Sequence, residues 1–82
     1  SILDAAWLKT ESADIQLYYN TVVYSDNEYV RYDFYDRVME YNHRYEAYKN
    51  AVENPWTSWL FDADVLTDCA PINFELNTGT YG

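Results

Sequence analysis

The sequence predicts a mainly α protein, a small helical bundle around a long central helix over 26–53, with an extended C-terminal segment. The first observation is that residues 1–54 contain neither of the two strong helix breakers, because the first proline is Pro55 and the first glycine is Gly79. The second is a helix start signal just before the central helix. The third is the heptad-like spacing of apolar side chains within it.

The residues before the central helix predict one short helix and one ambiguous segment. Apolar residues in 2–9 step by three, which favours a short helix followed by a turn. In 13–24, Ser12 can cap a helix, whereas the valine and tyrosine residues favour a strand. We prefer the helix. The alternative is an α+β fold in which strands 15–24 and 71–77 pair against the central helix.

Both ends of the central helix carry local signals. Ser25 and Glu28 match the capping box S-x-x-E, and Asp26 adds a negative charge near the helix N-terminus. Asn54-Pro55 ends the helix, because a residue before proline avoids the α region. The helix would be about 42 Å long, whereas a compact domain of this size has a radius of gyration of about 12 Å. We therefore expect a kink, or a homodimer in which the helix end packs on a second copy.

An apolar stripe runs along the central helix in alternating steps of four and three residues. It consists of Phe34, Val38, Tyr41, Tyr45, Tyr48 and Val52. Further apolar or aromatic residues of the first half lie off the stripe, and they are Tyr29, Tyr32, Tyr35 and Met39. We infer that the first half lies between two neighbours and that the second half offers a single face.

The C-terminal third contains a second apolar group and an alternating segment. The chain can restart a helix at Pro55, which would place Trp56, Trp59 and Leu60 on one side. Apolar and polar residues alternate in 71–77, which favours a short strand or an extended arm. The 82 residues are predicted to form a single domain, 1–82.

Signals for catalysis or metal binding are weak. Glu40 and His43 match half of the Glu-x-x-His pattern of di-iron bundles, and only a second copy would supply the other half. A nucleophilic pair of Cys69 with His43 is a further alternative to a lone buried cysteine. We expect a surface histidine and a buried thiol, and therefore no enzyme, no cofactor and no metal.

The segment DADVLTD places three carboxylates close together, at Asp62, Asp64 and Asp68. An EF-hand loop needs a ligand at position 5 and glycine at position 6, where this chain has Leu66 and Thr67. The segment predicts an acidic loop or helix start, with weak divalent binding or a protein-binding patch as alternatives.

The overall charge limits the classes of partner. The chain has 14 acidic and 5 basic residues and a formal charge of −9. It offers no basic footprint for direct nucleic-acid binding, and an anionic membrane would repel it. Aromatics make up 20% of the residues and hydrophobics 49%, which argues against disorder. A single cysteine and the lack of a long apolar run favour a cytoplasmic protein. The charge therefore leaves a cation, a basic protein or no partner at all, and of these we expect a basic protein.

Each basic residue of the central helix has an acidic neighbour three or four positions away, which predicts that these cations are occupied within the helix. The predicted pairs are Glu28–Arg31, Asp33–Arg37, Glu40–Arg44, Glu46–Lys49 and Lys49–Glu53.

Carboxylates gather on one side of the central helix. Asp26, Asp33, Asp36 and Glu40 fall within an arc of about 80°, away from the apolar stripe, and make an acidic ridge. Residues 54–82 add acids without a base, namely Asp62, Asp64, Asp68 and Glu75.

Small size, acidity, aromatic content and helix-borne acids together resemble the small acidic DNA-mimic inhibitors of phages, among them anti-restriction and anti-CRISPR proteins. The resemblance lies in composition and covers no motif. It implies that carboxylates stand in for phosphates and block the basic nucleic-acid-binding surface of a target protein in the host cytoplasm. The expected contact residues are Asp26, Tyr29, Tyr32, Asp33, Asp36, Glu40, Asp62, Asp64, Asp68 and Glu75. The alternative function is a helical structural or adaptor module that assembles through its tyrosine-rich stripe.

Overall fold

The structure is a computed structural model that describes residues 4–73. Within these residues it contains the helices α1 (Ala5–Val23), α2 (Glu28–Glu53) and α3 (Asp64–Asp68), and the short 3-10 helix η1 (Ser58–Leu60). The described residues contain no β-strand, so the mainly α prediction is confirmed. The preferred helix over 13–24 is confirmed up to Val23, and the alternative strand over 15–24 is wrong. The other predicted strand, 71–77, is not a strand at 71–73, and its remainder lies outside the described residues.

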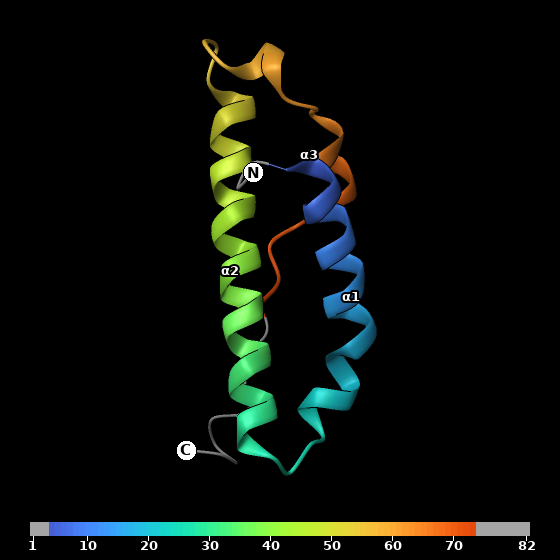
Figure 1. Cartoon of the computed structure of the whole chain (residues 1–82). Coiled ribbons are helices and arrows are strands. Elements are labelled where there is room, and N and C mark those ends of the chain that lie inside the picture. The colour runs from blue at the N-terminus through green and yellow to red at the C-terminus, as the bar shows by residue number, and fades with distance from the viewer. Residues whose placement is uncertain (1–3, 74–82) are drawn as a thin grey trace.

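The two long helices form an antiparallel hairpin, and the remaining segments pack along it (Figure 1). A short turn at 24–27 joins α1 to α2, and α3 contacts α1. The molecule measures 46 × 21 × 20 Å, with a radius of gyration of 14.5 Å. The long helix therefore finds its packing partner within the same chain, without a second copy at its end. The homodimer stays a prediction.

Helix α1 is one continuous helix. The side chain of Asp4 caps it by accepting a hydrogen bond from the backbone N–H of Trp7 at 3.1 Å. The predicted division into a helix over 2–9, a turn and a cap at Ser12 is wrong. Ser12 is buried inside the helix, and its hydroxyl accepts a hydrogen bond from Gln16 at 3.0 Å. Packing of one face against α2 overrides the turn preference of the polar residues.

Helix α2 starts two residues later than predicted, at Glu28. The capping-box prediction is wrong, because Asn27 is the cap. Its side-chain oxygen accepts two backbone hydrogen bonds from the first helical turn, at 2.9 and 3.3 Å. The Ser25 hydroxyl instead accepts a hydrogen bond from the Asn27 backbone N–H at 3.1 Å. Asp26 therefore lies in the turn before the helix.

The predicted apolar stripe forms the α2 side of the core. Its residues from Phe34 to Tyr48 are buried, and Val52 is partly buried. Buried partners come from the other elements, and they are Leu8, Ile15, Val22, Val65 and Cys69. The period of 3.6 residues therefore identified the core side of α2 correctly.

The inference that the first half of α2 lies between two neighbours is not supported in the described chain. The off-stripe side chains are exposed by 38% to 80%, and they are Tyr29, Tyr32, Tyr35 and Met39. One face of α2 is buried from Phe34 to Tyr48, and the aromatic residues elsewhere contribute to the surface.

The buried tyrosines of α2 hold the chain that follows it. The Tyr41 hydroxyl donates to the carbonyl of Ala70 at 2.9 Å. The Tyr48 hydroxyl donates to the carbonyl of Asp62 at 3.0 Å and accepts from its backbone N–H at 2.9 Å. Each phenol thus places its ring in the core and its hydroxyl on a backbone group at the rim, as a small core requires.

An asparagine holds the C-terminal segment alongside α2. The side-chain amide of Asn42 donates to the carbonyl of Ile72 at 2.7 Å, and its oxygen accepts from the Ile72 backbone N–H at 2.8 Å. Residues 71–73 belong to no helix or strand, and the rest of the predicted extended C-terminal segment lies outside the described residues.

Candidate binding surface

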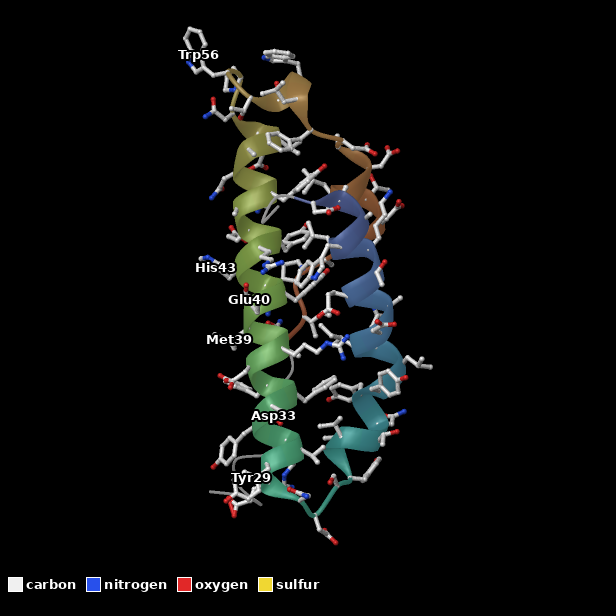
Figure 2. The ribbon with its side chains drawn as sticks, in the orientation of Figure 1. Tyr29, Asp33, Met39, Glu40, His43 and Trp56 are labelled. Atoms are coloured by element: carbon white, nitrogen blue, oxygen red, sulfur yellow. The ribbon has the colours of Figure 1, made fainter. Side chains whose placement is uncertain are left out.

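The acidic ridge lies on the outer side of α2, together with exposed rings. We call the set Tyr29, Tyr32, Asp33, Asp36 and Glu40 the acidic face. At about 100° per residue these positions span an arc of about 100°, roughly opposite the buried stripe. All are exposed, Tyr29 by 80%. Figure 2 labels Tyr29, Asp33 and Glu40 in succession along α2.

Most carboxylates of this region carry no counter-charge. Asp26, Asp33 and Asp36 form no ion pair within residues 4–73. Glu40 does, because its Oε1 accepts from the Arg44 Nε at 2.8 Å, as the helix spacing predicted. The acidic face therefore presents two unpaired carboxylates on α2, with a third in the adjoining turn at Asp26.

Asp33 forms no ion pair within residues 4–73, because its predicted partner Arg37 binds other carboxylates. Arg37 reaches across the hairpin, with its Nη2 2.6 Å and its Nε 2.9 Å from the two carboxylate oxygens of Glu11. Asp14 lies 3.5 Å from the same Nη2. The hydrogen bonds to Glu11 raise the pKa of the Arg37 guanidinium. The predicted Asp33–Arg37 pair is therefore wrong. The Glu11 carboxylate on the facing helix binds the planar Arg37 guanidinium through two parallel hydrogen bonds, which is the stronger arrangement.

The second acidic group does not join the acidic face. Asp62, Asp64 and Asp68 lie around α3, beside the N-terminal part of α1, whereas the acidic face occupies the N-terminal half of α2 (Figure 1). Asp62 accepts a hydrogen bond from the backbone N–H of Asp64 at 2.9 Å, and Asp68 pairs with Lys9 at 3.5 Å. The structure thus separates the predicted contact residues into two regions. Glu75 lies outside the described residues.

A third exposed group was recognised as apolar in the sequence but given no role. We call the group of Trp56, Trp59 and Leu60 the tryptophan tip. Its residues are exposed by 85%, 77% and 57%, in that order. They occupy the connection after α2, and Figure 2 shows Trp56 at one end of the molecule. The Trp59 ring nitrogen donates to the Trp56 carbonyl at 3.1 Å, and the Thr57 hydroxyl donates to the Ala51 carbonyl at 2.6 Å. These contacts connect the tip to its own backbone and to the last turn of α2.

The residues considered for chemistry are kept apart. Cys69 is buried, and burial raises the pKa of its thiol. His43 is exposed and extends from α2 on the side away from α1 (Figure 2), so a Cys69–His43 nucleophile pair is wrong. Among residues 4–73, no cluster of three or more histidine, cysteine or carboxylate side chains is placed to hold a metal ion.

Together these features define an acidic helical hairpin with one acidic, tyrosine-bearing outer face. No family model, no curated protein and no solved structure matches the chain significantly. None of the helices in the described residues has the length and apolar character needed to cross a membrane. Function is therefore inferred from the charges, exposures and contacts of this chain.

Proposed function

We propose that this protein is an inhibitor that occupies the basic nucleic-acid-binding surface of another protein. The observation that carries the proposal is the acidic face, where Asp33 and Asp36 are exposed, unpaired within residues 4–73 and adjacent to the exposed ring of Tyr29. Carboxylates accept the same charge-assisted hydrogen bonds from arginine and lysine as phosphates do. Tyrosine rings stack on guanidinium planes, so the pairing of the two groups suits an arginine-rich surface.

The remaining acids act at longer range. A formal charge of −9 creates a field that attracts a basic protein and speeds its encounter with the acidic face. The group at Asp62, Asp64 and Asp68 would touch only a target that extends along much of the 46 Å length of the molecule. We therefore assign primary contact to the acidic face and steering to the second group.

The test compares two charge-reversed variants with the unchanged protein. Asp33→Lys/Asp36→Lys removes the acidic face, whereas Glu46→Lys/Glu53→Lys makes the same change in net charge further along α2 at two exposed acids. Each is used to capture partners from a bacterial lysate. We expect the unchanged protein and the second variant to retain nucleic-acid-binding proteins, and the first variant to lose them.

The complex should also respond to salt and to DNA. Raising the salt from roughly 50 to about 300 mM should release the captured proteins, because screening weakens exposed ionic contacts. Duplex DNA should release them by competition. Capture that is indifferent to both treatments, or lost equally in both variants, would overturn the proposal.

The alternative function, an adaptor that assembles through its tyrosine-rich stripe, would have to use a different surface. Tyr45 and Tyr48 are buried by their own chain, so assembly through the tyrosine stripe is wrong in that form. The tryptophan tip is the observation that favours an adaptor, because aromatic side chains are enriched at the centres of interfaces. If the protein is an adaptor of this kind, Trp56→Ser/Trp59→Ser should remove an assembly seen by light scattering, and the acidic-face variant should keep it.

A further inference from the structure

A hollow lies between α1 and α2 near the turn that joins them. Its volume is about 310 Å³, and it is lined by Tyr18, Val22, Val30, Asp33, Phe34 and Arg37. Val22 and Phe34 are buried and form its floor, whereas Tyr18 and Val30 are exposed by 49% and 40% and form its walls. The lining is thus apolar at the base and charged at the rim. We call it the hairpin groove.

The groove lies between the turn and the bridges that cross this side of the hairpin, and the bridging Arg37 forms its boundary. Arg37 binds Glu11 of α1, and the Arg44 guanidinium lies 4.3 Å from the centre of the Trp7 ring. Both arginines therefore cover the space between the helices further from the turn. Residues 71–73 lie on the other side of α2, since Asn42, which binds Ile72, projects about 140° away from Arg37.

The rim of the groove is negative. Asp33 lines it from α2 without an ion pair in the described chain, and Arg37 is already bound by the carboxylates of Glu11 and Asp14. Of the two charged residues in the lining, Arg37 is thus balanced by two carboxylates of α1, whereas Asp33 keeps its negative charge. Asp33 also belongs to the acidic face, so the groove and the acidic face form one continuous surface.

We infer that the hairpin groove receives an apolar side chain of a basic partner segment, whose lysines or arginines pair with Asp33 and Asp36. This inference rests on the proposed function and names the kind of segment that the acidic face recognises. The volume is at the lower end of ligand sites, so it suits one leucine or phenylalanine side chain better than a whole cofactor. An apolar anchor surrounded by charge pairs is the usual arrangement of an interface centre.

The experiment uses two synthetic helical peptides of equal positive charge. One carries leucines along one side among its lysines and arginines, and the other has serine in place of each leucine. Binding of both to the full chain is measured by calorimetry at roughly 50 mM and at about 300 mM salt, and the two peptides are compared at the same salt concentration. We expect the leucine peptide to bind about tenfold more tightly or better, which is the gain from burying a single large apolar side chain.

Two matched variants locate the effect. Val30→Phe fills the hairpin groove and should abolish most of the preference for the leucine peptide. Leu17→Phe adds the same ring at a position of α1 that is 70% exposed and does not line the groove, so it should leave the preference unchanged. Backbone amide chemical shifts of the unchanged protein, followed during titration with the leucine peptide, should move most at Tyr18, Val22 and Val30.

The outcomes separate the two proposals. If both peptides bind equally and salt weakens both, the acidic face is supported and the groove inference is overturned. If neither peptide binds at low salt, both proposals fail. A leucine preference that Val30→Phe leaves intact, or shifts that gather at the tryptophan tip, would also overturn the groove inference. If circular dichroism shows that Val30→Phe does not fold, the groove inference is tested by the chemical shifts of the unchanged protein alone.

Discussion

Single side chains connect the core of this protein to the irregular chain that follows α2. The Tyr48 hydroxyl is both donor and acceptor for the backbone of Asp62, and the Asn42 amide does the same for Ile72. Neither contact belongs to a regular helix or sheet. A segment with little secondary structure thus obtains backbone hydrogen bonds from side chains of α2, as buried backbone groups require.

The Tyr48 contact should be measurable. Tyr48→Phe keeps the buried ring but leaves the N–H and C=O of Asp62 without this partner, so we expect it to lower the free energy of unfolding by about 1–2 kcal/mol. Tyr45→Phe is the matched control, because Tyr45 is also buried and no hydrogen bond of its hydroxyl is found within residues 4–73. Its effect should stay within about 0.5 kcal/mol. Equal losses in urea denaturation would contradict the role assigned to the Tyr48 hydroxyl.

At the scale of the elements, the two helices are joined by apolar packing and by cross-helix cation contacts. Arg37 binds Glu11 in a bidentate manner and Arg44 stacks on Trp7, so both arginines of the middle of α2 contact α1. The Glu11 side chain is only 14% exposed, so it depends on Arg37 for its counter-charge. The packing of the apolar stripe is non-directional, whereas these contacts depend on the relative position of the two helices.

Removal of the Arg37 bridge should loosen the hairpin. We expect Arg37→Ala to reduce the free energy of unfolding by about 1–2 kcal/mol, because it leaves the partly buried Glu11 carboxylate without a partner. Lys49→Ala is the control, since Lys49 lies on the same helix and forms no ion pair in the described chain. Its effect should be within about 0.5 kcal/mol. Thermal unfolding of both variants provides the comparison, and similar losses would contradict the bridge.

The sequence predicted α2 well because its signals are local. The apolar period and Asn54-Pro55 identified the helix, its core side and its end. The sequence predicted a break within α1 that does not exist. Thr10 and Ser12 favour turns and caps locally, and only the packing against α2 shows that they continue the helix. Local spacing could not show that Asn27 would replace Ser25 as the cap, since both residue types cap helices.

The candidate surface was predictable only in part. The exposed side of α2 follows from the same period as its buried side, so Asp33, Asp36 and Glu40 could be placed together. That Asp33 would be unpaired could not be predicted, because it depends on Glu11 lying opposite Arg37 in the hairpin. The separation of Asp62 from the acidic face also required the path of the chain after Pro55.

At the scale of the whole molecule, an elongated shape carries a large negative charge. The radius of gyration of 14.5 Å exceeds the expected value of about 12 Å, because two long helices lie side by side with little beyond their ends. The acids are thereby distributed over an extended surface, which reduces their mutual repulsion compared with a sphere. The described cations bind carboxylates or the Trp7 ring in several places, whereas Asp33 and Asp36 of the acidic face form no ion pair within residues 4–73.

Salt should therefore act in opposite directions on folding and on binding. Raising the salt should increase Tm, because screening relieves the self-repulsion of a chain with a charge of −9. A gain of about 1 kcal/mol corresponds to about 4–8 °C in a domain of this size. The same salt should weaken the complex with a basic partner. A Tm that falls with sodium chloride would show that the internal ion pairs outweigh the self-repulsion.

The exposure of Trp56 and Trp59 determines what the ultraviolet emission of this protein reports. These two indoles are in water before the chain unfolds, and only Trp7 is partly buried, with the Arg44 guanidinium over its ring. Native emission should thus be red-shifted and strongly quenched by the uncharged quencher acrylamide, and it should change little when the helices melt. The same two indoles are therefore suited as probes of a molecule docking at that end, whereas loss of helicity is followed better by circular dichroism.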